Sequence, residues 1–210
     1  MHRIGILAGF ALFVAVNAGS AWALEVKQLK TATDRLGSRI VEQYDVKEKA
    51  YKGELGRDVK TVAIIVTALC NSPRHYREAN GPYLSEPVKF LVAQVSGGND
   101  KSLSLETMAW IKLALAATKN EKYEAVLKRL PEAKLPDLQI KVETPTADQE
   151  VLTALLYAWY SKTIEKKDAT DMAESLMKLQ QKNGSISDNI QVNALALELL
   201  NLCYSVLIKG

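Results

Sequence analysis

The sequence predicts an all-α protein built from about four stacked helical hairpins. Two kinds of helix alternate along it: a short amphipathic outer helix such as Ser85–Gln94 precedes a longer inner helix such as Leu103–Ala117, which is apolar on nearly all sides. The inner helices also share a register. Each carries an alanine in its second turn, in steps of 46, 45 and 40 residues, at Ala63, Ala109, Ala154 and Ala194. A repeating helix pair of this length is typical of stacked hairpins.

Each hairpin can be assigned its two helices. The expected outer helices are Lys27–Tyr44, Ser85–Gln94, Glu121–Leu130 and Asp168–Lys182. The expected inner helices are Arg57–Asn71, Leu103–Ala117, Ala147–Lys162 and Asp188–Ile208. The first inner helix is rich in β-branched residues and alone resembles a buried strand, but its length and its place in the repeat favour a helix. Thr146 and Gln149 form a capping-box pattern, and the charged segment Val46–Gly56 is expected to be a loop.

The first 23 residues have the features of an export signal. A positive start at Arg3 precedes the apolar stretch Ile4–Val16, and Ala21-Trp22-Ala23 is a small-residue cleavage site. The alternative is an uncleaved membrane anchor, since Ile4–Trp22 approaches the length of a membrane span. We expect cleavage, leaving residues 24–210 as a single helical repeat domain in the periplasm or outside the cell, with no further membrane span.

Charge and cysteine content limit the function further. The net charge of +3 is too small and too dispersed to predict a nucleic-acid partner. Cys70 and Cys203 each lie late in an apolar helix, where a lone cysteine usually behaves as a small buried hydrophobe. An oxidising compartment would permit a disulfide between them, so sequence spacing leaves the pairing open while burial favours two free thiols.

Two stretches suggest a family. Ala68–Tyr76 followed by Gly81–Leu84 and Pro87–Gln94 resembles the secreted bacterial proteins with prenyltransferase and squalene-oxidase repeats. The close match covers roughly Asp58–Thr118, and Gln180–Ile186 is similar to a repeat motif of Gln, Gly and an aromatic residue, with isoleucine in the aromatic place. The resemblance implies the α/α toroid of terpenoid cyclases and protein prenyltransferases. Such a toroid has about six hairpins and this chain has room for about four. We therefore expect a partial toroid: an arc with an exposed apolar inner-helix surface, or a ring completed by a second copy.

The chain lacks the catalytic motifs of the fold it resembles. It has no Asp-x-Asp-Asp run and no Cys-Gly-Glu-Gln thioester. It also lacks the Gly-x-Ser-x-Gly elbow that marks an unrelated class of hydrolases. Asp168 and Asp171 are better explained as acidic residues at a helix N-terminus than as Mg²⁺ ligands. Without the signal, His75 is the single histidine, so a zinc site is not expected. We predict no catalytic residue, cofactor or metal.

Two groups of residues are candidates for ligand contact. In the resembled fold, ligands bind where the inner helices begin, which would place a rim at Arg57, Asp58, Glu106, Trp110, Asp148, Gln149, Asp188 and Gln191. The alternative roles are core packing for Trp110 and helix capping or first-turn charge for the others. Arg74, His75, Tyr76 and Arg77 could contact an anion or a carbohydrate, or could complement the dipole of the preceding helix C-terminus.

These observations favour an exported binding or scaffolding protein that holds a protein, a peptide or an apolar ligand on its inner-helix surface. One alternative is a cyclase- or lyase-like enzyme that uses dispersed residues such as Arg57, Asp58 and Glu106. Another is a subunit that completes a larger helical ring, for example as a homodimer. Fold resemblance alone does not decide among them.

Overall fold

The computed structural model describes residues 26–96, 102–132, 135, 145–161 and 163–209. The predicted export signal lies outside this part of the chain. A helix at residues 26–42, named here the first described helix, comes first. The elements after it are β1 (Tyr44–Asp45), β2 (Ala50–Tyr51), η1 (Glu54–Arg57), α2 (Val59–Asn71), η2 (Glu78–Asn80), α3 (Pro82–Ser96), α4 (Leu105–Ala117), η4 (Glu121–Tyr123), α5 (Glu124–Arg129), α6 (Gln149–Tyr160), α7 (Lys166–Leu179) and α8 (Ile190–Lys209).

The all-α class is confirmed, and every expected helix has a counterpart. The β-branched stretch is helical: Asp58 caps α2 by accepting a 2.8 Å hydrogen bond from the Thr61 amide, and residues Thr61–Cys70 are all buried. Burial on every side satisfies the apolar residues of α2, so tertiary packing overrides their preference for strands. Both cysteines are buried free thiols, as burial favoured.

Several boundaries differ from the prediction. The cap of α6 is Asp148 rather than Thr146, because the Asp148 carboxylate accepts from the amides of both Glu150 and Val151. The expected 46–56 loop includes the turn and second strand of a short antiparallel hairpin, whose first strand, Tyr44–Asp45, precedes it, with Tyr44 paired with Tyr51. Strands of two residues are too short to show the alternation that predicts a strand.

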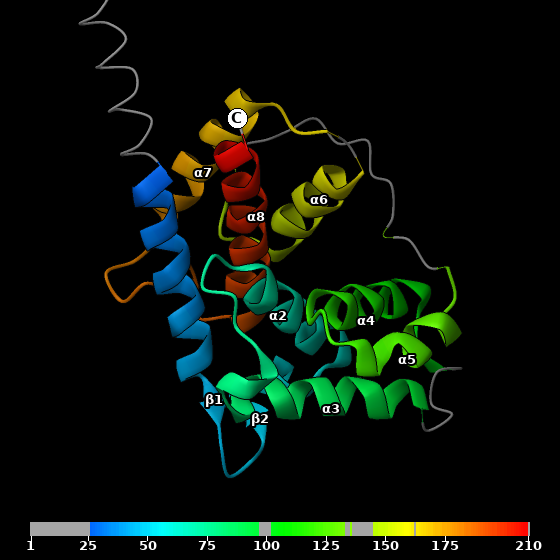
Figure 1. The fold of residues 1–210 in the computed structure, drawn as a ribbon. Coiled ribbons are helices and arrows are strands. Elements are labelled where there is room, and N and C mark those ends of the chain that lie inside the picture. The colour runs from blue at the N-terminus through cyan, green and yellow to red at the C-terminus, as the bar shows by residue number, and fades with distance from the viewer. Residues whose placement is uncertain (1–25, 97–101, 133–134, 136–144, 162, 210) are drawn as a thin grey trace, which may run out of the picture.

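The helix contacts do not confirm the toroid, and they contradict the open arc. α2 packs against α4 and α8, and α6 packs against α8. Figure 1 shows α3, α4 and α5 gathered near α2, with α6 and α7 beside α8. The first and last inner helices therefore meet, whereas an arc would hold them apart. Among the described residues, the large exposed apolar side chains are Val46, Leu105 and Ile208, from three separate segments.

By length and composition α8 could cross a membrane, which its sequence did not lead us to expect. However, 78% of its most apolar window is buried inside the protein. Residues Ile190–Asn201 are buried without interruption, in contact with α2, α6 and α7. Its apolar surface is thus already covered by other helices, as in the core helix of a globular domain.

Proline inside α3 creates one long-range hydrogen bond. Pro87 has no N–H, so the carbonyl of Tyr83, four residues earlier, lacks its helical donor. The buried hydroxyl of Tyr51 donates to that carbonyl at 2.6 Å. The hairpin is thereby attached to α3 at the point where the helical hydrogen bond is missing.

Replacing Tyr51 with phenylalanine should lower the free energy of unfolding by about 1–3 kcal/mol, because it leaves the Tyr83 carbonyl without a donor. In a Pro87→Ala background the backbone amide gained at position 87 can bond that carbonyl, so Tyr51→Phe should cost clearly less. Urea unfolding of the natural protein, the two single variants and the double variant measures the cost of Tyr51→Phe in each background. An equal cost in both backgrounds would show that the Tyr51 hydroxyl does not replace the missing helical donor.

Candidate functional site

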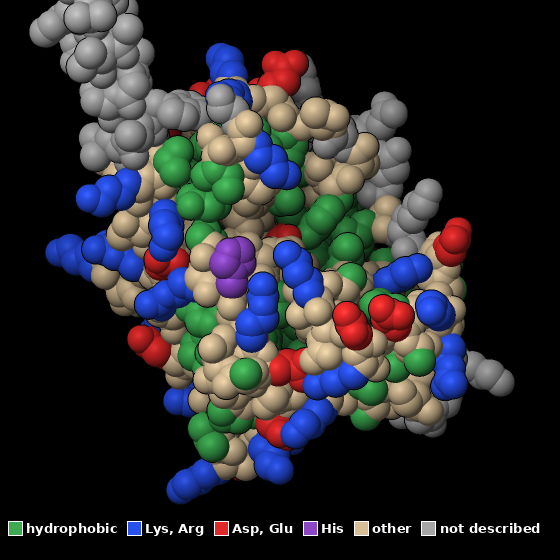
Figure 2. Space-filling view, viewed as in Figure 1, with side chains coloured by type: hydrophobic (Ala, Val, Ile, Leu, Met, Phe, Trp, Pro, Cys, Tyr) green, Lys and Arg blue, Asp and Glu red, His purple; other side chains and the backbone are tan. Residues whose placement is uncertain are grey.

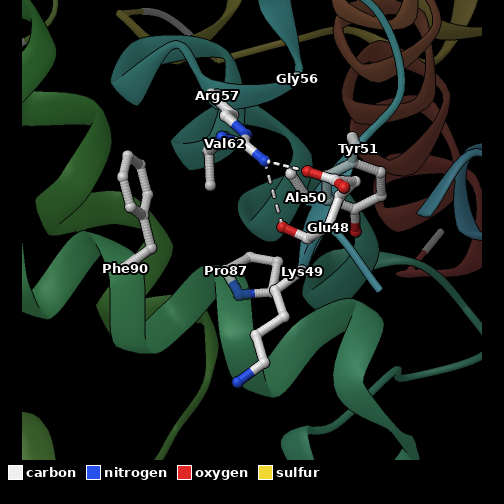
Figure 3. Close-up of a pocket in the computed structure, with 9 residues that line it drawn as sticks. All are labelled: Glu48, Lys49, Ala50, Tyr51, Gly56, Arg57, Val62, Pro87 and Phe90. Carbon is white, nitrogen blue, oxygen red and sulfur yellow. Dashed lines mark hydrogen bonds and ion pairs between the residues drawn. The ribbon is translucent and has the colours of Figure 1, made fainter. Parts of the chain in front are cut away.

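A pocket of about 250 Å³ lies between the β1–β2 hairpin, η1, the start of α2 and α3. Its lining residues are Glu48, Lys49, Ala50, Tyr51, Gly56, Arg57, Val62, Pro87 and Phe90 (Figure 3). Pro87 and Phe90 come from α3, and Val62 comes from the first turns of α2. The continuous stretch from Glu48 to Val62 and the separate helix α3 thus surround one small cavity, which we name the hairpin pocket.

Close backbone packing shapes the hairpin pocket. Gly56 in η1 lies against β2, and a Cβ at this position would be 1.8 Å from the Tyr51 carbonyl oxygen. A side chain there would push η1 away from the hairpin, so glycine is required. The tight approach carries the next residue, Arg57, to the pocket entrance, where Figure 3 shows it facing Glu48.

The pocket has apolar walls and a charged entrance. Val62 is only 3% exposed and Pro87 is buried, while Phe90 is half-buried. Arg57 Nη2 donates to Glu48 Oε2 at 2.7 Å, and both side chains are about two-thirds exposed, at 67% and 68%. The volume is below the usual range for drug-sized ligands. It suits a single apolar group such as one amino-acid side chain.

Of the predicted rim, Glu106 and Trp110 share one cluster of contacts. Glu106 Oε1 lies 2.5 Å from Lys60 Nζ and also accepts from the Tyr157 hydroxyl. Trp110 Nε1 donates to the same hydroxyl at 3.2 Å. Burial alone would raise the pKa of Glu106, but the hydrogen bonds from Lys60 and Tyr157 hold that pKa below its usual value. The Tyr157 hydroxyl uses its proton and a lone pair within the cluster, so it ties α4 to α6.

The other predicted rim residues are spread over helix starts and the pocket. Arg57 lines the hairpin pocket, and Asp58 and Asp148 are the N-caps of α2 and α6. Gln149 is the first residue of α6, Asp188 is exposed before α8, and Gln191 is buried in the first turn of α8. Among the described residues, no hydrogen bond or ion pair joins Asp148 or Asp188 to Glu106. The rim therefore does not form one continuous polar site.

The Arg74–Arg77 segment divides between two environments. Arg77 Nη1 donates to the carbonyls of Cys70 at 3.3 Å and Tyr76 at 3.0 Å, so it satisfies the C-terminal end of α2. His75 is exposed and has a positive φ of 51°. Arg74 turns instead toward the first described helix and donates to Ser38 Oγ at 2.6 Å. The four residues do not converge on one ligand position.

Sequence reasoning missed a buried carboxyl group on α8. Glu198 has no exposed surface and accepts from the Tyr160 hydroxyl at 2.5 Å, Asn71 Nδ2 at 2.8 Å and Asn201 Nδ2 at 3.1 Å. These partners tie α8 to the C-terminal ends of α2 and α6. Burial raises the pKa of Glu198, although the three hydrogen bonds oppose the shift. A single acidic residue in the middle of a long, leucine-rich helix was the available signal.

Among the described residues, no group of three or more His, Cys, Asp or Glu side chains is arranged to hold a metal ion. The chain matches no protein-family model, and comparison with curated proteins and with solved structures gives no significant match. The family resemblance therefore stays a prediction.

The raised pKa of Glu198 predicts a pH-dependent contribution to stability. The folded protein holds this proton to a higher pH than the unfolded chain, whose glutamate pKa is about 4.3. The stabilisation is complete below that value and is lost as the pH rises through the raised pKa. The stability of the natural protein minus that of Glu198→Gln should therefore fall as the pH rises from about 4 to 8.

Glu106→Gln is the matched control, because the pKa of Glu106 is lowered and its effect has the opposite sign. The stability of the natural protein minus that of Glu106→Gln should fall as the pH is lowered through the acid range. Urea unfolding across the pH series measures both differences. A Glu198 difference that does not change with pH would show that this carboxyl titrates normally.

Proposed function

We propose that this chain is an exported, non-catalytic binding protein whose hairpin pocket holds an apolar side chain of a peptide or protein partner. The observation that supports this most is the half-open pocket with apolar walls and a charged entrance. Interfaces commonly place an apolar anchor in a pocket and surround it with polar contacts. The pocket of about 250 Å³ is large enough for one such anchor.

The lining chemistry favours binding over turnover. Tyr51 commits its hydroxyl proton to the Tyr83 carbonyl, and Val62, Pro87 and Phe90 carry no group that can transfer a proton. Arg57 and Glu48 at the entrance are paired with each other. A ligand would therefore be recognised by its shape and apolar surface, together with polar groups near the entrance.

The proposed position differs from the inner-helix surface that the sequence suggested. Side chains of neighbouring helices cover that surface along α2 and the first half of α8. A ligand there would have to displace the core, whereas the hairpin pocket is already open. Export is part of the proposal because the chain begins with an apolar stretch followed by a signal-peptidase-type cleavage site.

The binding proposal predicts that an apolar probe enters the hairpin pocket. N-acetyl-phenylalaninamide should shift the amide NMR signals of Ala50, Tyr51, Gly56 and Val62 in isotope-labelled protein. Phe90→Ala removes one apolar wall and should weaken binding about tenfold, since about 1.4 kcal/mol of contact is lost.

Leu105→Ala is the matched control, because Leu105 is a large apolar residue that is 65% exposed and lies outside the pocket. This variant should bind the probe as the natural protein does. N-acetyl-glycinamide, which lacks the apolar group, should cause no shifts at the same concentration. Probe-induced shifts confined to other parts of the protein, or equal binding by Phe90→Ala, would refute the proposed site.

A further inference from the structure

A second concave surface lies between the first described helix and the turn at residues 182–184. It encloses about 450 Å³, and we name it the basic groove because Arg35, Arg39, Arg74 and Lys182 are among its lining residues. Figure 2 shows Lys and Arg side chains gathered on the side of the molecule formed by the first described helix. The groove shares no lining residue with the hairpin pocket.

Within the part of the chain that the structure describes, three of the four cations form no ion pair, although the pKa of Arg74 is raised by its hydrogen bond to Tyr76 and also by the nearby Asp34 carboxylate. The two acidic lining residues are engaged locally: Asp34 pairs with Lys30 at 2.8 Å, and Glu42 pairs with Arg39 at 3.0 Å. Among the described residues, no ion pair is formed by Arg35, Arg74 or Lys182. These three come from the helix, the segment after α2 and the turn after α7, so the fold brings their charges together.

Hydrogen bonds fix the arginine that enters the groove from the segment after α2. Arg74 Nη1 donates to Ser38 Oγ at 2.6 Å and to the Tyr76 hydroxyl at 3.3 Å. Tyr76 is only 9% exposed, and its ring packs beside Gly37, where a Cβ would approach it to 3.3 Å. The guanidinium is therefore held in place before any ligand binds, which lowers the entropy cost of binding.

The opposite wall is fixed as well. Gln180 Nε2 donates to the carbonyls of Ala32 at 3.0 Å and Gly184 at 2.9 Å, which joins the turn to the first described helix. Gly184 has a φ of +88° and lies so close to Arg35 that a Cβ would be 3.3 Å from Arg35 Cβ. These contacts set the width of the groove between Arg35 and Lys182.

We propose that the basic groove binds a phosphate group, carried either by a soluble phosphomonoester or by a lipid headgroup. Two guanidinium groups supply the paired N–H donors that match phosphate oxygens, and the ammonium of Lys182 adds a third charge. A phosphomonoester carries a charge of about −1.5 to −2 near neutral pH, which suits three unpaired cations better than a singly charged carboxylate does.

Isothermal titration calorimetry with inorganic phosphate tests the site. The natural protein should bind phosphate more tightly than acetate at equal ionic strength, and binding should weaken as salt is added. The double variant Arg35→Gln/Arg74→Gln should lose at least about tenfold in affinity. Lys128→Gln, which removes a 79% exposed cation on α5, should bind phosphate unchanged. Absence of phosphate binding, equal binding of acetate, or unchanged affinity in the double variant would overturn the proposal.

Vesicles distinguish the two sources of the phosphate group. Cosedimentation with phosphatidic acid vesicles, absent with phosphatidylcholine alone and lost in the double variant, would assign the group to a lipid headgroup. Phosphate binding in solution without cosedimentation would assign it to a soluble phosphomonoester. Cosedimentation that the double variant retains would place the lipid contact elsewhere and contradict the groove as its site.

Discussion

The packing of α2 against α8 is the contact on which the rest of the structure depends. It joins helices separated by more than a hundred residues, and each is buried along most of its length. Polar groups within the contact fix its register: Asn71 Nδ2 donates to Glu198, and Asn201 Nδ2 donates to the Ala68 carbonyl at 2.8 Å. Because an unpaired buried polar group costs free energy, sliding one helix along the other is unfavourable. α4 is then placed against α2, and α6 and α7 against α8.

Both proposed binding surfaces lie outside this core and are shaped by local backbone constraints. At the hairpin pocket, Gly56 permits the close approach of η1 to β2, and the missing amide of Pro87 is replaced by the Tyr51 hydroxyl. At the basic groove, Gly184 allows the turn to approach the first described helix, and Gln180 holds it there. The core provides fixed attachment points. The charges that line the two binding surfaces come from the hairpin, η1, the first described helix and the segments after α2 and α7.

Hydrophobic periodicity predicted where the helices lie, because the core-facing side of each helix must be apolar whatever it packs against. It could not predict which helices meet. Tyr157 contacts Glu106 on α4 and Tyr160 contacts Glu198 on α8, and such pairs depend on crossing geometry that spacing along one helix does not encode. The assumption that successive inner helices form an arc therefore failed where α2 met α8. Candidate site residues were harder to predict than helices. Nothing in the sequence placed Arg57 in a pocket with residues of α2 and α3, since the hairpin that brings them together has strands of only two residues.

Native-state hydrogen exchange would test the α2–α8 contact most directly. If the two helices form one packed unit, the amides of Ala68 and Leu69 in α2 should open with the same free energy as those of Leu199 and Leu200 in α8. That free energy should equal the one for global unfolding. If the α8 amides exchange through an opening that costs clearly less, α8 detaches while α2 stays folded. The contact would then not be what holds the fold together.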